Sequence, residues 1–277
     1  MFRSDLEERA SSPSYEPVKP QSGLWSFIKK FGAPLIAIGL LLSKFKGLSL
    51  LLLKVKFLGT ALTMLVSIGA YALLFPWSFA VGIVLLIWVH EMGHVLQLKR
   101  EGIAASAPMF IPFLGAFVAM KQMPKDALAE ARVGLAGPIL GTMGGFAVLG
   151  LYALTGEPVF LGLAYFNFLI NLFNLAPLLP LDGGRAVGAM SLVFQVLGLG
   201  MMVVMVFIAP IMAFVAILGL PELWNRWKTR NEPEGRAYYD LPLKSRVGVG
   251  VVYIGLIVTL GFLTAATFVP NPGRMFG

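Results

Sequence analysis

The sequence predicts an all-α polytopic membrane protein, a bundle of about six transmembrane helices with a re-entrant loop or hairpin. Hydrophobic residues make up 57% of the 277 residues and charged residues only 13%. Several apolar runs approach or exceed the roughly 20 residues that a helix needs to cross a bilayer. Lys and Arg gather at the edges of these runs, so the formal net charge of +8 indicates membrane topology rather than binding to nucleic acid.

The N-terminal part of the chain precedes the predicted membrane core. Residues 1–22 are polar, with four acidic side chains and three prolines, and are predicted to form a disordered tail. Their acidity argues against a transit peptide. Residues 23–56 consist of short apolar pieces interrupted by Lys, which predicts an interfacial or re-entrant amphipathic segment.

The predicted membrane core comprises residues 57–220 and begins with two apolar spans, at 57–75 and 77–98. A Lys-Arg pair follows the second span directly, which indicates that this span ends on the cytoplasmic side. Residues 107–120 are rich in Phe, Pro and Gly and too short for a spanning helix. We therefore expect a re-entrant loop or hairpin there.

Two further spans, at 132–154 and 158–176, are expected to be joined by a tight Thr-Gly-Glu-Pro turn. Residues 191–220 are apolar throughout and carry a proline in the middle. They are long for one tilted span and short for two. Because the basic residues that follow would then return to the cytoplasmic side, we favour a short helical hairpin over a single span.

The remaining residues are predicted to form a cytoplasmic loop and one more span. The loop covers 221–246 and contains Arg226, Lys228 and Arg230. Residues 247–277 would form the terminal transmembrane helix, from 247 to 268, and a short tail.

Both histidines of the chain lie near the end of the second predicted span, in the sequence His90-Glu-Met-Gly-His94. Positions i and i+4 share one face of a helix, so both imidazoles can bind one zinc ion. Glu91 follows the first ligand, where it can act as a general base on water. The alternative is that these side chains only bond a neighbouring helix. Ionisable side chains in a bilayer cost roughly 2.5 to 3.5 kcal/mol each, which favours metal binding.

A third ligand is required, because a catalytic zinc ion has three protein ligands and one open position. The chain has no Cys and no third His, so the remaining ligand is predicted to be a carboxylate. Glu157 lies in a turn on the far side of the membrane. Asp182 follows a span that ends on the same side as the histidines, which makes it the candidate. A turn or helix N-cap is the alternative interpretation of Asp182.

The two motifs together resemble those of the site-2 protease family of intramembrane zinc metalloproteases. HEMGH at 90–94 matches the family's HExxH motif, and the stretch Asn-Leu-Ala-Pro-Leu-Leu-Pro-Leu-Asp-Gly at 174–183 matches its NxxPxxPLDG motif. The resemblance extends over about residues 57–190. Many bacterial members carry a PDZ domain between the motifs. This chain has no room for one there and resembles a minimal member.

The resemblance implies a zinc metalloendopeptidase. One Zn²⁺ ion would be bound by His90, His94 and Asp182. Glu91 would activate water, and Asn174 would help to hold the substrate or the transition state.

The implied substrate is a single-pass membrane protein or a membrane-retained peptide. It would be cleaved within the lipid bilayer near the cytoplasmic side, as in regulated intramembrane proteolysis. The implied location is the bacterial cytoplasmic (inner) membrane, with the active site toward the cytoplasm and no nucleic acid as partner. The residues alone leave two other functions open, a divalent-cation transporter and a catalytically inactive metal-binding scaffold.

Two repeated patterns flank the candidate site. Asparagines lie on one face of the span at 158–176, at Asn167, Asn171 and Asn174. We interpret the first two as interhelical hydrogen-bonding residues and only the third as a site residue. Glycines recur at every fourth residue of the preceding span, at Gly137, Gly141 and Gly145. They predict close helix packing.

Overall fold

The computed structural model of the protein describes residues 56–191, 194, 196, 198–200, 211–229 and 231–268. The predicted tail at 1–22 and the predicted interfacial segment at 23–56, apart from Lys56, lie outside the described residues. The described residues form helices and one small two-stranded antiparallel sheet. The predicted all-α class is therefore confirmed.

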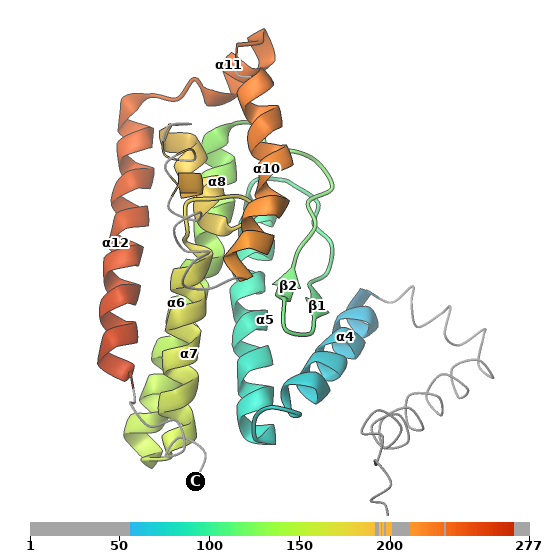
Figure 1. Ribbon diagram of the computed structural model, residues 1–277, viewed down its shortest axis with the longest axis vertical. Coiled ribbons are helices and arrows are strands. Elements are labelled where there is room, and N and C mark those ends of the chain that lie inside the picture. The colour runs from blue at the N-terminus through green and yellow to red at the C-terminus, as the bar shows by residue number, and fades with distance from the viewer. Residues whose placement is uncertain are drawn as a thin grey trace, which may run out of the picture. The chain divides into compact units, whose positions relative to one another are not determined.

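Four helices lie alongside one another and form the bundle, as Figure 1 shows. In chain order they are α5 (Trp77–Arg100), α6 (Ala127–Thr155), α7 (Pro158–Asn174) and α12 (Leu243–Thr267). Helices α5, α6 and α12 are long and apolar enough to cross a membrane, and α7 is apolar but shorter. The spans predicted in these four regions are present as helices.

A tight turn joins α6 to α7, as the sequence predicts. Helix α6 begins at a capping residue, Asp126, whose carboxylate accepts a hydrogen bond from the Ala129 amide at 2.7 Å. It ends at Gly156, which adopts a left-handed conformation with φ of 72° that glycine tolerates best. Only Gly156 and Glu157 separate the two helices. Helices α5 and α7 consequently run in the same direction, and their C-terminal ends lie at the same end of the bundle (Figure 1).

Helix α4 (Lys56–Tyr71) is shorter than the predicted span at 57–75, because the chain leaves the helix in a turn before Pro76. Its 16 residues measure about 24 Å along the helix axis, less than the hydrocarbon core of about 30 Å. Two of its hydroxyls form hydrogen bonds with the segment at 107–120, which follows α5 in the chain. Thr60 Oγ1 donates to the Pro108 carbonyl at 2.8 Å, and the Phe110 amide donates to Thr63 Oγ1 at 3.3 Å.

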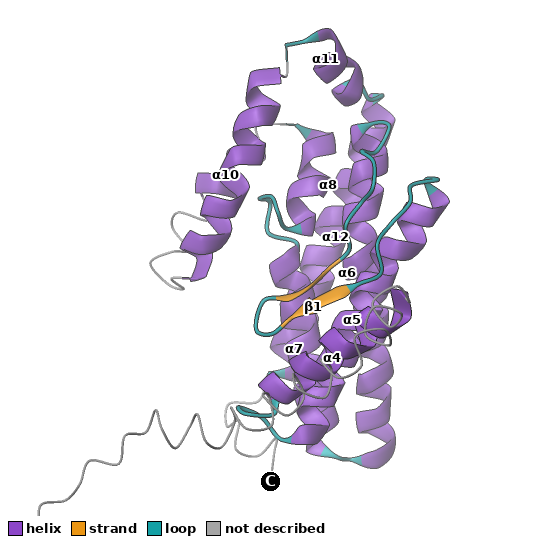
Figure 2. Cartoon of the chain, turned by 90° about the vertical axis from the view of Figure 1, so that its right-hand side faces the viewer, coloured by secondary structure: helices purple, strands orange, loops and turns teal. Residues whose placement is uncertain are grey.

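The stretch at 107–120 forms a β-hairpin, one of the two structures predicted for it. Strand β1 (Met109–Ile111) pairs with β2 (Gly115–Phe117) in antiparallel register, with Phe110 opposite Ala116. Strand β1 packs against α4, and β2 packs against α5. Figure 2 shows both strands on the side of the bundle where α4 lies. Among the described residues, β2 pairs with no strand other than β1.

The segment at 221–246, which the sequence predicts to be a cytoplasmic loop, is largely helical. Helix α10 (Ile211–Thr229) continues through Pro221, and α11 (Pro233–Tyr239) follows it. The middle of the predicted helical hairpin at 191–220, residues 201–210, lies outside the described residues, so the hairpin stays a prediction.

Arg226 of α10 is buried, although the sequence suggested an exposed loop charge. Its guanidinium lies 2.6 Å from a carboxylate oxygen of Glu130 on α6 and 2.9 Å from one of Glu222. Tyr238 of α11 donates to the other oxygen of Glu130 at 2.8 Å. Burial and the Glu130 carboxylate raise the pKa of Tyr238, so the phenol keeps its proton. This Glu130 cluster, Glu130 with Arg226, Glu222 and Tyr238, holds α10 and α11 against α6.

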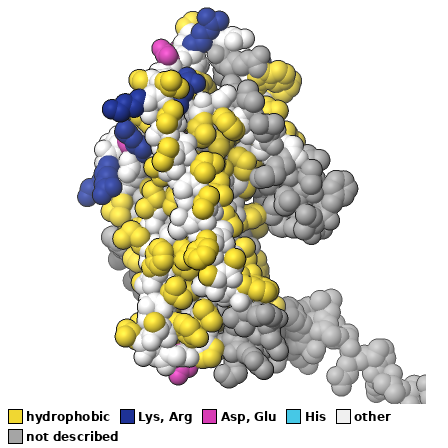
Figure 3. All heavy atoms as spheres, turned by 90° about the vertical axis from the view of Figure 1, so that its left-hand side faces the viewer, with side chains coloured by type: hydrophobic (Ala, Val, Ile, Leu, Met, Phe, Trp, Pro, Cys, Tyr) yellow, Lys and Arg dark blue, Asp and Glu magenta, His cyan; other side chains and the backbone are white. Residues whose placement is uncertain are grey.

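The outer face of the bundle is divided by charge. Figure 3 shows Lys and Arg side chains at the upper end and apolar side chains along the rest of this face. The upper end is the one at which α5 ends and α12 begins (Figure 1). Large apolar side chains that are exposed on α12 include Val251, Ile254, Val258 and Phe262. Apolar side chains exposed over the length of a helix are expected of a helix that faces lipid.

Candidate metal centre

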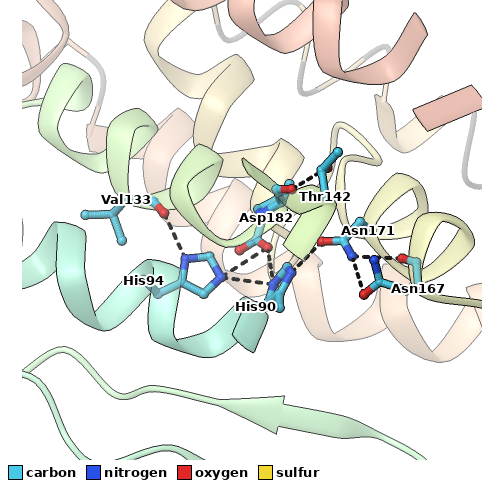
Figure 4. Close-up of polar contacts among 8 residues, drawn as sticks. His90, His94, Val133, Thr142, Asn167, Asn171 and Asp182 are labelled. Atoms are coloured by element: carbon cyan, nitrogen blue, oxygen red, sulfur yellow. Dashed lines mark hydrogen bonds and ion pairs between the residues drawn. The ribbon is translucent and has the colours of Figure 1, made fainter. Parts of the chain in front are cut away.

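Three potential metal ligands converge between α5 and α8 (Asp182–Met190), as Figure 4 shows. His90 and His94 lie one turn apart on α5, and their Nε2 atoms are 3.1 Å from each other. Oδ2 of Asp182, the first residue of α8, lies 3.1 Å from Nε2 of His90 and 3.3 Å from Nε2 of His94. The structure therefore brings together the three residues that the sequence proposed as ligands.

The other ring nitrogen of each histidine is held by a neighbouring helix. Nδ1 of His94 donates to the Val133 carbonyl of α6 at 2.8 Å, since a carbonyl oxygen can only accept. Nδ1 of His90 lies 2.8 Å from Oδ1 of Asn171 on α7. When the rings are neutral, these contacts leave both Nε2 atoms unprotonated and able to bind a metal.

Asn171 is the site residue that the sequence interpretation missed. Its amide nitrogen donates to the Asn167 carbonyl at 2.8 Å, which leaves Oδ1 to accept from His90. The Asn167 amide in turn donates to the Gly141 carbonyl of α6 at 2.8 Å, so the interhelical role predicted for Asn167 is confirmed. The stripe of asparagines was the available signal. The sequence did not show that the partner of Asn171 would be a histidine of the site.

The glycine repeat on α6 makes room for the site as well as for helix packing. A methyl group at Gly137 would collide with the imidazoles of His90 and His94. A methyl group at Gly141 would collide with the side chain of Asn171. The predicted close packing is confirmed, and it brings the α6 backbone directly against both rings and against Asn171.

The position of Asp182 depends on the tight packing of the chain around it. The loop before α8 folds closely enough that a methyl group at Gly183 or Gly184 would collide with the backbone of residues 175–179. Leu181, not Asp182, is the residue that precedes the first turn of α8. The carboxylate of Asp182 therefore points toward the histidines and does not occupy the N-cap position.

The donor set fits a zinc ion. Ligand atoms bound at about 2.0 to 2.1 Å to a tetrahedral zinc lie about 3.3 Å from one another. The separations of 3.1, 3.1 and 3.3 Å match this spacing. Two unprotonated imidazole nitrogens and a carboxylate oxygen would otherwise place three acceptors together without a donor, and a cation resolves that conflict.

Glu91 and Asn174 line the cavity beside this cluster. The cavity has a volume of about 250 Å³, and we call it the site cavity. Its polar walls are formed by His90, Glu91, His94, Asn174, Asp182 and Arg185. The hairpin forms another wall, with residues in and beside strand β2, namely Leu114, Ala116, Phe117, Val118 and Met120. Glu91 is buried, and Asn174 is half-buried at the C-terminal end of α7.

A second cavity of about 330 Å³, which we call the apolar cavity, shares His90, Glu91 and Asn174 with the site cavity. Apolar side chains dominate the rest of its lining, among them the aromatic residues Tyr71, Phe113, Phe166 and Phe173. The carboxylate of Glu91 is thus accessible from a space lined by polar groups and from one lined by apolar groups.

The region that carries the histidines matches a known protein family. The family model of peptidase family M50 matches residues 78–162, which include both histidines and Glu91. This region is therefore similar to peptidase family M50, the site-2 protease family. The M50 match ends before Asn174 and Asp182, so the structure is what places Asp182 with the histidines. With its apolar helices, the protein is an integral membrane protein.

Two relatives carry names that agree with the M50 match. The zinc metalloprotease MJ0392 of Methanocaldococcus jannaschii is 31% identical over 106 residues, which are 36% of this chain and 30% of that protein. Rip3 of Mycobacterium tuberculosis, provisionally named a zinc metalloprotease, is 30% identical over 136 residues, which are 44% of this chain and 34% of Rip3. The matched region thus spans about a third of each relative's length.

Proposed function

We propose that the protein is an intramembrane zinc metalloprotease that hydrolyses a peptide bond in the membrane-spanning segment of a substrate protein. One observation carries the proposal: His90, His94 and Asp182 converge at the spacing of zinc ligands, with Glu91 in the same cavity, inside an apolar helical bundle. The M50 match and the names of the relatives support the same chemistry.

Each site residue has a distinct part in the proposed reaction. His90, His94 and Asp182 hold the zinc, which when bound polarises a carbonyl group and makes water more acidic. Glu91 accepts a proton from the attacking water and passes it to the leaving amine. Asn174 offers its side-chain amide to a carbonyl oxygen of the substrate.

Strand β2 supplies the remaining element of the proposal. A substrate helix must unwind before its backbone can be attacked, which leaves polar groups without partners in hydrocarbon. Residues of β2 line the site cavity, and among the described strands β2 pairs only with β1 and so has a second edge without a partner strand. An extended peptide that pairs with this edge would recover the hydrogen bonds that it loses on unwinding.

The proposed location is the bacterial cytoplasmic membrane, with the site near the cytoplasmic side. The charge division in Figure 3 supports this orientation, because cytoplasmic ends of membrane helices are enriched in Lys and Arg. His90 lies nine residues before Lys99, about 14 Å along the axis of α5. Substrates would be single-pass membrane proteins or membrane-retained peptides, cut in regulated intramembrane proteolysis.

Cleavage in proteoliposomes tests the proposal. The protein is loaded with zinc and reconstituted with a single-pass reporter whose membrane segment carries a Gly-Pro pair near its cytoplasmic end. We expect zinc-dependent cleavage within that segment. The variant Glu91→Gln should keep its zinc and lose cleavage by about 100- to 10,000-fold, the usual contribution of a general base. Metal transport without cleavage would favour a transporter, and zinc binding without either activity would favour an inactive scaffold.

A further inference from the structure

Arg185 is a basic residue of the site cavity to which the proposed mechanism assigns no role. It lies on α8 three residues after Asp182, so both side chains emerge from the same side of the helix. Arg185 is half-buried and lines the cavity together with the three ligands and Glu91. It is also close enough to Glu91 for an electrostatic interaction.

The guanidinium of Arg185 lacks an oxygen partner among the described residues. Its one hydrogen bond goes from Nη1 to the thioether sulfur of Met120 at 3.5 Å, and thioether sulfur is a weak acceptor. None of the ion pairs formed by described residues includes Arg185. Within the described part of the chain, most of its five N–H donors therefore have no acceptor of their own.

Other arginines of the protein have oxygen atoms of the chain as partners. Arg226 contacts two carboxylates, and Arg246 donates to the carbonyls of Met190, Tyr239 and Leu241. Arg185 differs from both because it faces a cavity instead of oxygen atoms of the protein.

The base of the Arg185 side chain is held in place. A methyl group at Gly134 of α6 would collide with Cβ of Arg185 and with the Asp182 carbonyl, so α6 packs directly against this turn of α8. At its far end the side chain reaches Met120, beyond strand β2. Arg185 thus bridges the space between the α8 wall and the hairpin wall of the site cavity.

We propose that Arg185 is a substrate-binding residue that donates hydrogen bonds to a backbone oxygen of the peptide in the site cavity. This inference rests on the proposed protease function. An unwound peptide presents carbonyl oxygens that have lost their helical donors, and cleavage adds a carboxylate at the new C-terminus. Both are oxygen acceptors that suit a guanidinium fork.

The kinetics of reporter cleavage test this role. Hydrogen bonds to charged groups are worth about 1.5 to 3 kcal/mol, so Arg185→Gln should lower kcat/KM by about 10- to 100-fold. Arg185→Lys keeps the positive charge and a long aliphatic side chain but not the planar guanidinium. Its kcat/KM should fall between those of the unmodified protein and Arg185→Gln. Both variants should retain full zinc. Arg132→Gln, which removes a half-exposed arginine of α6 outside the site cavity, is the matched control and should cleave normally.

Peptide binding provides a measurement that does not depend on turnover. Zinc-loaded Glu91→Gln protein, with and without Arg185→Gln, is titrated with an N-acetylated hexapeptide of Leu, Val and Ala. The peptide is used with a free carboxylate and with a C-terminal amide. If Arg185→Gln lowers the affinity for both peptides equally, by about tenfold or more, the acceptor is a carbonyl oxygen. If Arg185→Gln lowers the affinity only for the peptide with the free carboxylate, the acceptor is the carboxylate of the cleavage product.

Three results would overturn an assignment. If Arg185→Gln cleaves the reporter and binds both peptides as well as the unmodified protein, Arg185 does not bind substrate. If Arg185→Gln and Arg185→Lys both lose zinc, Arg185 supports the position of Asp182 instead. If the zinc-loaded unmodified protein cleaves no reporter, the proposed protease function fails, and the peptide titration still shows whether Arg185 binds a backbone oxygen.

Discussion

Two buried polar clusters lie in this apolar bundle, and their charges are balanced in different ways. In the Glu130 cluster, a guanidinium contacts two carboxylates, and a tyrosine hydroxyl donates to one of these, so the chain supplies both signs of charge. In the metal centre, two imidazole nitrogens and a carboxylate oxygen face one another, and no Lys or Arg in the described part of the chain is paired with Asp182. The first cluster holds helices together, whereas the second offers three ligand atoms that could hold a metal ion.

Removal of a ligand should have the largest effect. Asp182→Ala leaves two imidazoles, and a catalytic zinc ordinarily has three protein ligands, so we expect loss of zinc and of all cleavage. Elemental analysis of the purified variant, together with the reporter assay, measures both. His90→Ala and His94→Ala should behave in the same way. Full zinc occupancy in Asp182→Ala would remove this residue from the metal centre.

Breaking the Glu130 cluster should lower the stability of the fold and leave the zinc content unchanged. Arg226→Met leaves the buried carboxylate of Glu130 without its cation, which should lower the free energy of unfolding by about 3 to 5 kcal/mol. Thermal unfolding in detergent, with zinc content measured in parallel, checks this. The double variant Glu130→Gln/Arg226→Met should recover much of the loss. Equal destabilisation in the single and double variants would contradict the charge-balance argument.

A substitution of Asn171 tests whether a residue that contacts a ligand, and not the metal itself, affects zinc binding. Asn171→Ala removes the partner of His90 Nδ1 and should weaken zinc affinity by about 10- to 100-fold without abolishing binding. Competition with a chelator of known affinity measures the change. Asn167→Ala breaks the bond to Gly141 and the longer 3.3 Å bond from Asn171, but it keeps the backbone carbonyl that holds the Asn171 amide at 2.8 Å. It is the control and should change zinc affinity less. The reverse order would mean that Asn171 does not orient His90.

The smallest effect is expected from a label that tests whether both clusters lie at the cytoplasmic end. The chain has no Cys, so Thr229→Cys at the end of α10 introduces a single exposed thiol without disturbing activity. In intact cells an impermeant thiol reagent should label it only after the membrane is opened. Labelling from outside would place the Glu130 cluster on the opposite side from the one proposed.

Features that depend on short spacing were predictable from the sequence. His90 and His94 share a helix face because they are four residues apart, and the direction of successive spans was enough to bring Asp182 to the same end. The hairpin at 107–120 was predictable because a short, Gly- and Pro-containing run cannot form a spanning helix. Local geometry and the count of crossings determine all of these features.

Contacts between distant segments were not predictable in the same way. Arg226 looked like a loop charge because its partner Glu130 lies 96 residues away and nothing in the local pattern points to it. The stripe of asparagines identified a polar face on α7 but not the helix that this face would meet. The early end of α4 was missed for a related reason, since an apolar turn and an apolar helix have the same composition.

The turn between α6 and α7 has a consequence for how accurately the site must be assembled. Val133 on one arm and Asn171 on the other orient the two imidazoles, and two residues connect the arms. A slip of one residue between the arms would move a ring partner by about 1.5 Å, whereas metal–ligand distances tolerate only about 0.2 Å. The shortness of that connection therefore limits assembly errors, and lengthening it with flexible residues should lower the fraction of molecules that fold ready to accept zinc.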